Sequence, residues 1–119
     1  MKHSESLKKT ADFQRVYHTG KSLANRYLVM YVRKNGLARN RIGISVSKKV
    51  GNSVVRHHLT RLIRESYRLS EEKYPVGYDL VLVVRVHAKD CTYFEIDRAM
   101  NQLAKRHHLL EDEHETADD

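Results

Sequence analysis

The stretch SVSKKVGNSVVRHHLTRLIRESYR, residues 45–68, constrains the fold of this chain more than any other. It predicts the end of a strand, a tight turn at Gly51 and then a basic helix, because glycine reaches a positive φ without steric cost. Asn52 or Ser53 is the expected N-cap, whose side-chain oxygen accepts a free backbone N–H of the first helical turn. The stretch therefore predicts a strand-to-helix unit around which the rest of the domain is organised.

The helix predicted in this stretch has two contrasting faces. At 100° per residue, one narrow face that should be buried carries Val55, Leu59, Leu62, Ile63 and Ser66. The opposite face carries Arg56, His57, Thr60, Arg61, Arg64 and Arg68, and the only acid in the helix is Glu65. A solvated helix face normally mixes both signs of charge through i,i+4 pairs. A nearly unopposed row of cations, with Lys48 and Lys49 beside it, favours a polyanionic partner over a role in solubility alone.

The distribution of charge along the chain supports a polyanionic partner. The 119 residues carry a net charge of +7, with 16 Lys and Arg against 3 Asp and Glu in residues 1–68, and 6 against 12 in residues 69–119. Nucleic acid is favoured over a membrane, because no segment forms an amphipathic anchor and no apolar run approaches the ~20 residues of a bilayer span. No signal peptide is evident, and the single Cys91 excludes a disulfide framework. These features predict a cytoplasmic protein with no membrane partner.

Strand and helix signals alternate along the rest of the chain. The polar residues 1–9 are expected to be frayed, and Thr10 is the expected N-cap of a helix over 11–18. Two extended segments, 21–24 and 26–33, lead to a turn at Asn35-Gly36 and to a strand at RIGISVS, residues 41–47. A turn at 75–77 follows the central helix.

The C-terminal part completes a single α+β domain. The β-branched run at 79–86 predicts a central strand that is covered on both faces and parallel to another strand. A Thr92-x-x-Glu95 capping box opens a last helix, whose apolar face carries Ile96, Ala99, Met100 and Leu103. The domain is expected to span residues 1–110, and the acidic residues 111–119 are expected to be a disordered tail.

Aromatic residues on the first helix and the second extended segment suggest a second binding surface. Phe13 and Tyr17 share one side of the helix, and the alternation of YLVMYVR separates Tyr27, Val29, Tyr31 and Arg33 from the core-facing Leu28, Met30 and Val32. Rings beside positive charge can stack on the bases of single-stranded nucleic acid. Core packing explains the helix aromatics equally well at this stage. The small residues Gly43, Ser45 and Ser47 permit close approach by a helix or a ligand.

No catalytic constellation or metal site is evident in the sequence. Cys91 has no partner histidine at a known spacing, and no glycine-rich phosphate loop or nucleophilic serine motif is present. The pairs His57-His58 and His107-His108 are adjacent, so on a helix they point 100° apart and cannot share one ion. The chain is interpreted as a binding protein, and a nuclease that uses His57 and His58 as an acid–base pair is kept as an alternative.

Several segments together resemble the protein subunit of bacterial ribonuclease P. They are LKKTADFQRVYHTGKSLANRY, RIGISVSKKVGNSVVRHHLTRLIRESYR and YDLVLVVR, and with the last helix they cover residues 7–109. The resemblance implies an α-β-β-β-α-β-α sandwich of the ribosomal protein S5 domain 2-like type, with a four-stranded mixed sheet and a left-handed βαβ crossover. It also implies an accessory subunit, without catalytic residues of its own, of an endoribonuclease that removes the 5′ leader of precursor tRNA.

The resemblance assigns roles to particular residues. The 5′-leader-binding positions are Phe13, Tyr17, Val29 and Tyr31, and the RNA-binding positions are Lys48, Lys49, Arg56, His57, His58, Arg61, Arg64 and Arg68. The family's arginine–asparagine–arginine signature departs here, because Arg56 is kept while His57 and His58 replace the other two residues. The implied partners are the catalytic RNA and the precursor tRNA leader, with no small-molecule substrate. The protein is expected to hold no cofactor, because the RNA is expected to bind the Mg²⁺.

Two other functions remain to be separated from this one. A stand-alone, sequence-tolerant RNA-binding protein of ribosomal type would share the charge but does not require an aromatic cleft. An autonomous nuclease would have to cleave RNA without an RNA subunit. Leader preference, the purpose of the acidic tail and the oligomeric state are not encoded in any recognisable pattern.

Overall fold

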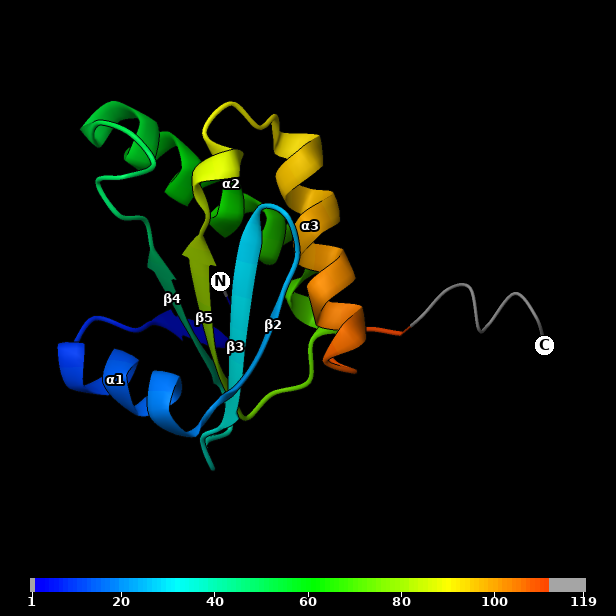
Figure 1. The fold of residues 1–119 in the computed structure, drawn as a ribbon. Coiled ribbons are helices and arrows are strands. Elements are labelled where there is room, and N and C mark those ends of the chain that lie inside the picture. Colours follow the sequence, from blue (N-terminus) through cyan, green and yellow to red (C-terminus); the bar gives the residue numbers. More distant parts are fainter. Residues whose placement is uncertain (1, 112–119) are drawn as a thin grey trace.

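The computed structural model describes residues 2–111, and the predicted acidic tail lies outside the described residues from 112 onward. Its elements follow in the order β1 (Ser4–Ser6), α1 (Thr10–Thr19), β2 (Lys21–Ala24), β3 (Leu28–Lys34), β4 (Asn40–Ser45), α2 (Ser53–Ser70), the 3-10 turn η1 (Glu71–Lys73), β5 (Tyr78–Val84), the 3-10 turn η2 (Val86–Ala88) and α3 (Tyr93–Arg106) (Figure 1). This order confirms the predicted α+β class and adds a strand at the N-terminus.

The strands form one mixed sheet in the order β1-β4-β5-β3-β2. The central strand β5 pairs in parallel with β4, as the β-branched run at 79–86 predicts, and antiparallel with β3, and it ends at Val84, before the predicted residue 86. In Figure 1 both β4 and β5 point upward, β5 lies to the right of β4, and α2 passes behind the sheet, so the β4–α2–β5 crossover is left-handed. The large majority of such crossovers are right-handed, and the resemblance implied this exception.

The predicted count of four strands is wrong, because residues 4–6 add a fifth strand. The N-terminus is not frayed there: β1 pairs in parallel with β4, and the backbone N–H of Leu7 donates to Ile42 at 2.9 Å. The carboxylate of Glu71 accepts the backbone N–H groups of Lys2 and His3 at 2.7 and 3.2 Å. Backbone pairing, rather than side-chain periodicity, orders this segment, so the polar sequence gave no strand signal.

The helices cover the sheet from opposite faces. The main core, which includes Leu80 and Leu82 of β5, lies between the sheet and the pair α2 and α3. The alternating residues Val81 and Val83 pack with Leu7 and with α1 on the other face. β5 is therefore covered on both faces, and this explains why its sequence is apolar without alternation. The described part of the chain contains no helix that is long and apolar enough to span a membrane.

The ends of the helices confirm most of the capping predictions and correct two. The side chain of Asn52 caps α2 by accepting the backbone N–H of Val55 at 3.0 Å, and Thr92 and Glu95 form the predicted capping box of α3. Lys9, rather than Thr10, occupies the N-cap of α1. The positive φ predicted at Gly51 is also wrong, since the described glycines with positive φ are Gly36 and Gly77.

Space, rather than backbone conformation, requires glycine at position 51. A Cβ atom there would lie 2.7 Å from Cγ1 of Val55 and 2.8 Å from its Cβ, which is closer than such atoms approach in proteins. The buried face of α2 also differs slightly from the prediction. Leu59, Ile63 and Ser66 are buried as expected, Tyr67 joins them, and Val55 and Leu62 are only half-buried.

Candidate nucleic-acid interface

Three rows of side chains cross the sheet face that α1 covers in part. The register places Arg33, Asp79 and Arg41 in one row and Tyr31, Val81 and Gly43 in the next. The third row contains Val29, Val83 and Ser45, all of which are half-buried. The rows change from charged to aromatic to small and apolar in the direction of the N-terminal end of α2.

Aromatic side chains of α1 stand over the middle row. The ring centroids of Tyr17 and Tyr31 are 5.0 Å apart in an edge-on arrangement, and those of Phe13 and Tyr17 are 6.3 Å apart. A Cβ on Gly43 would lie 2.6 Å from the ring of Phe13, so only glycine permits this close approach. All three rings are half-buried. They serve as core residues of the small cluster and present surface at the same time.

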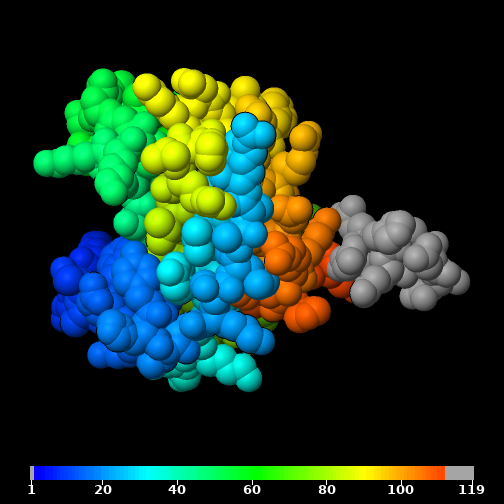
Figure 2. All heavy atoms as spheres, in the orientation of Figure 1, coloured from blue at the N-terminus to red at the C-terminus, as the bar shows by residue number. Residues whose placement is uncertain are grey.

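A hollow opens beside α1, toward the third row of side chains. Figure 2 shows this hollow between the blue surface of α1 and the green surface of the segment that leads into α2. The predicted cleft residues Phe13, Tyr17, Val29 and Tyr31 therefore lie on one face of the sheet. Ser45 and Val83 complete the floor, although neither was among the predicted site residues. The alternation of RIGISVS with the register to β5 places them there.

An ion-pair network fixes α1 beneath this hollow. Asp79 is buried and accepts hydrogen bonds from Nε and Nη2 of Arg41, both at 2.8 Å, and from Nδ2 of Asn35 at 3.0 Å. Arg41 also approaches Asp12 of α1, with Nη1 and Oδ2 3.9 Å apart. Burial alone would raise the pKa of Asp79, but the hydrogen bonds from Arg41 and Asn35 outweigh burial and hold this pKa below its ordinary value. The network therefore ties α1 to β4 and β5.

The α2 ridge, defined as Lys48, Lys49, Arg56, His57, His58, Arg61, Arg64 and Arg68, is largely unopposed by acids. Within residues 2–111, only Arg68 of this set forms an ion pair, with Glu65. Arg64 donates from Nη1 to Oγ of Ser6 at 2.9 Å, so it points toward β1. Lys48, Lys49 and Arg61 are exposed and unpaired. The predicted cationic face is confirmed as an arrangement, and its RNA contacts stay a prediction.

The two adjacent histidines of α2 lie on the same exposed part of the ridge. His57 and His58 line a shallow depression with Val54 and Arg61, and both imidazoles are exposed. The exposed Val54, whose relative accessibility is 75%, adds an apolar patch to this charged surface. Because the histidines line the same depression as Arg61, all three side chains could contact one ligand. No third group that would make them an acid–base site lines the depression.

Arg56 differs from its neighbours because its side chain is half-buried. Its Nε atom is the one buried side-chain donor in residues 2–111 that lacks a hydrogen-bond partner. The backbone oxygen of Arg56 accepts the hydroxyl of Thr60 at 2.9 Å, so Thr60 is used inside the helix and is not part of the ridge. A buried cationic donor without an acceptor is costly. An anion bound to the guanidinium would reduce this cost.

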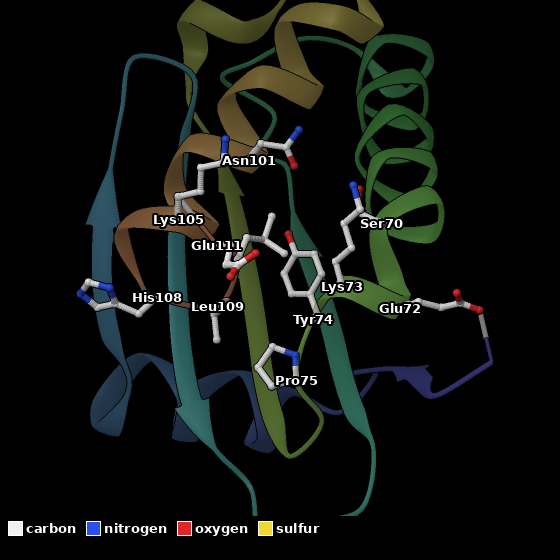
Figure 3. A pocket seen from close by; sticks show the side chains of 11 residues that line it. Ser70, Glu72, Lys73, Tyr74, Pro75, Asn101, Lys105, His108, Leu109 and Glu111 are labelled. Carbon is white, nitrogen blue, oxygen red and sulfur yellow. The ribbon is translucent and has the colours of Figure 1, made fainter. Parts of the chain in front are cut away.

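Other features of the described residues do not form a catalytic or metal site. No group of three or more His, Cys, Asp or Glu in residues 2–111 is arranged to hold a metal ion. Burial raises the pKa of the Cys91 thiol, so this cysteine is not an activated nucleophile. A cavity of about 940 Å³ lies between the C-terminal ends of α2 and α3, with Tyr74 pointing into it (Figure 3). Its lysines, Lys73 and Lys105, are balanced by acids, which gives the cavity no preference for an anion.

A mixed α+β sandwich with an unopposed cationic helix and a half-exposed aromatic cleft has the features of a small nucleic-acid-binding protein. Residues 1–108 match the Ribonuclease P family model. The chain is 58% identical over 107 residues to the ribonuclease P protein component of Lachnoclostridium phytofermentans, and the match covers 90% of this chain and 92% of that relative.

Solved structures give the same result. The ribonuclease P protein of Staphylococcus aureus superposes with a TM-score of 0.83 at 37% identity, over 89% of this chain and 97% of that one. The protein from Thermotoga maritima gives a TM-score of 0.78 at 32% identity, over 85% and 96% of the two chains. The chain therefore belongs to the ribonuclease P protein family, and its function is that of a protein subunit of ribonuclease P in tRNA processing.

Proposed function

We propose that this protein binds the catalytic RNA of ribonuclease P through the α2 ridge and the 5′ leader of precursor tRNA in the cleft between α1 and the sheet. The observation that carries the proposal is the unpaired charge of the α2 ridge within the described residues. Phosphates are the ligands that such charges match best, because each contact releases condensed counterions. The reaction is hydrolysis of a phosphodiester bond, and the RNA supplies both the catalytic centre and the Mg²⁺.

The two surfaces divide the work between the two RNA ligands. In this division, Arg56 and Arg61 bind phosphates of the catalytic RNA, and His57 and His58 donate further hydrogen bonds. A phosphate at Arg56 would also stabilise the guanidinium whose Nε lacks a partner. In the cleft, the half-exposed rings of Tyr17 and Tyr31 stack on leader bases without strict sequence preference. We expect the protein in the cytoplasm, where the precursor tRNA of a bacterium is processed.

The decisive experiment is cleavage of precursor tRNA at low Mg²⁺ with the protein alone, the RNA alone and both together. We expect rapid cleavage only when both are present. Cleavage by the protein alone would instead favour the autonomous nuclease. If the RNA alone were equally active at each Mg²⁺ concentration, the stand-alone RNA-binding protein would be the better interpretation.

A comparison of two substrates tests the division between the surfaces. Tyr31→Ala should weaken binding of precursor tRNA to the complex and leave mature tRNA almost unaffected, because mature tRNA has no leader. Arg61→Ala should weaken assembly of the protein with the catalytic RNA, and it should therefore lower the binding of both substrates. The matched control is Lys73→Ala, which removes an exposed charge outside both surfaces. Equal losses for both substrates with Tyr31→Ala would show that the ring acts only in packing.

A further inference from the structure

A second group of unpaired arginines surrounds the turn between β2 and β3. Arg26 lies in the turn, Arg85 follows β5, and Arg98 and Arg106 belong to α3. All four are exposed, and within residues 2–111 none of them forms an ion pair. The proposed function uses none of them. A cluster of exposed arginines that form no ion pair within residues 2–111 is unexpected on a surface that serves only solubility.

Intramolecular contacts hold three of these arginines, Arg85, Arg106 and Arg26, in place before any ligand binds. Nη1 of Arg85 donates to the backbone oxygen of Asn25 at 2.6 Å, and Nη1 of Arg106 donates to that of Ala24 at 3.1 Å. The guanidinium of Arg26 lies over the ring of Tyr27, 5.8 Å from its centroid. Each arginine has five N–H donors, so most of the donors remain free for a ligand. Positions fixed in this way reduce the entropy lost on binding.

The turn itself is attached to α3. Nδ2 of Asn25 donates to the backbone oxygen of Ala99 at 3.0 Å and to Oε1 of Gln102 at 2.9 Å. Figure 2 shows the turn, in blue, standing against the orange surface of α3. A depression of about 420 Å³ lies between them and is lined by Arg26, Tyr27 and Arg98 among others. The two segments therefore form one continuous surface.

An exposed aromatic residue extends this surface along α3. Phe94 has a relative accessibility of 74% and lines a second depression with Arg98, Gln102 and Lys105. Arg98 and Gln102 line both depressions, so the two are continuous. We call the whole the α3–turn surface, and its members are Arg26, Tyr27, Phe94, Glu95, Asp97, Arg98, Gln102 and Lys105.

Two carboxylates lie in this surface, Glu95 in the first depression and Asp97 in the second, and within residues 2–111 neither forms an ion pair with an arginine. Glu95 accepts the backbone N–H of Thr92 at 2.9 Å and the hydroxyl of Tyr27 at 3.3 Å. Asp97 accepts the hydroxyl of Ser66 at 2.8 Å and Nδ2 of Asn101 at 3.3 Å. Both acids therefore accept hydrogen bonds from neutral donors that hold the fold together. The arginines keep their capacity to bind an external anion.

We propose that the α3–turn surface binds a second segment of the ribonuclease P RNA. Arg26, Arg98 and Lys105 contact its phosphates, and Phe94 stacks on an unpaired base. RNA fits better than an acidic protein because amides and a free aromatic ring accompany the charges, which suits bases as well as phosphates. The surface lies across the sheet from α1, so this contact is separate from the leader cleft. The inference rests on the proposed function.

Photocrosslinking in the assembled complex tests the inference. A photoreactive phenylalanine analogue is placed in turn at Phe94, at Val54 beside the α2 ridge and at Val76 in the turn before β5, where the native side chains are 74%, 75% and 50% exposed. The complex contains full-length protein, the RNA subunit and precursor tRNA. We expect crosslinks to the RNA subunit from positions 54 and 94, at different nucleotides, and only background from position 76.

Each outcome of this experiment has one interpretation. Background at position 94 with a strong crosslink at 54 would overturn the inference and leave the proposed function standing. A crosslink from 94 to the precursor tRNA alone would overturn the assignment to the RNA subunit. Background at both 54 and 94 would count against the proposed function itself.

Salt titration gives a second and independent measurement. The double variant with Arg26→Gln and Arg98→Gln should reduce the slope of log affinity against log salt for the RNA subunit by about 1.4–1.8, which corresponds to two lost phosphate contacts. The matched control carries Lys2→Gln and Lys73→Gln, two exposed charges outside the surface, and should keep the slope. Unfolding curves of both variants establish that the fold is intact. An unchanged slope in the arginine variant would overturn the inference.

Discussion

The cleft between α1 and the sheet and the α2 ridge place the residues proposed to bind RNA in opposite relations to the core. In the cleft, Phe13, Tyr17 and Tyr31 are half-buried and form part of the small cluster under α1. On the ridge, Arg61 and His58 are exposed, and Leu59 and Ile63 on the other side of the helix supply the packing. A cleft residue therefore contributes to folding as well as to the proposed binding, whereas an exposed ridge residue such as Arg61 or His58 can change with little effect on folding.

This difference decides how mutational data on the two regions should be interpreted. A loss of leader binding after a cleft substitution contains a contribution from displaced α1, so stability has to be measured with affinity. A loss of RNA binding after substitution of an exposed ridge residue such as Arg61 can be interpreted directly as a lost contact. The departures from the family signature, His57 and His58, lie on the ridge, where the chain tolerates substitution without disturbing its core.

The largest effect is expected from the ion-pair network beneath the cleft. Asp79→Asn should lower the free energy of unfolding by about 3–5 kcal/mol, because it leaves Arg41 and Arg33 without their buried counter-charge. Glu65→Gln, which removes the exposed partner of Arg68, should cost less than about 1 kcal/mol. Urea unfolding of both variants measures the contrast. Equal losses of stability in the two variants would show that the ion pair on the α2 ridge matters as much for folding as the network beneath the cleft.

The same network predicts acid sensitivity. Since the pKa of Asp79 is held below its ordinary value in the folded protein, its contribution to stability is present above about pH 3.9, the ordinary aspartate value. That contribution is lost as the pH falls through the lower folded value. Asp79→Asn should therefore flatten the acid limb of a plot of stability against pH. An acid limb that is unchanged in this variant would assign the sensitivity to another group.

Phe13→Ala should act on both folding and binding. Loss of the half-buried ring should lower stability by about 2–3 kcal/mol and weaken precursor tRNA binding by about 1–3 kcal/mol. Gly43→Ala is the informative companion, because its Cβ would push the ring of Phe13 aside without removing it. Leader affinity and thermal unfolding, measured on the same samples, separate the two effects. A stable Phe13→Ala protein with normal leader affinity would place the ring outside the interface.

Arg61→Ala should change binding alone. We expect affinity for the RNA subunit to fall by about tenfold and the salt slope to decrease by about 1, as for one lost phosphate contact. Stability should stay within about 0.5 kcal/mol of the parent protein. Filter binding at several salt concentrations and a urea titration supply the two numbers. A substantial loss of stability would contradict the description of the ridge as structurally free.

The smallest effect is expected at the position that departs from the family. His58→Arg restores a permanent charge with a fork of donors, so affinity for the RNA subunit at pH 8 should rise by roughly two- to fivefold. His18→Arg, on an exposed site of α1, is the matched control. If neither variant tightens binding while Arg56→Ala and Arg61→Ala weaken it, His58 faces away from the RNA.

Much of the fold could be predicted because its signals are local. The Thr92–Glu95 capping box, the Asn52 cap and the turn at Gly36 depend on a few consecutive residues, and each is present as predicted. The β-branched run likewise identified the central strand. The strand at residues 4–6 could not be predicted, because it is ordered by backbone pairing with β4 and by Glu71, both distant in sequence.

The sequence alone determined the composition of both binding surfaces: a basic helix with one acid and a set of aromatics on α1 and β3. Periodicity is a property of consecutive residues, so it assigned these side chains to faces without a structure. Only the tertiary structure decided which faces meet, since the register of β3, β4 and β5 sets Ser45 and Val83 beside Val29. The tertiary structure also decided that Arg26 of the turn and Arg98 of α3 share one surface, although they are 72 residues apart in the sequence. The physical reason is that hydrogen bonds from Asn25 hold the turn against α3.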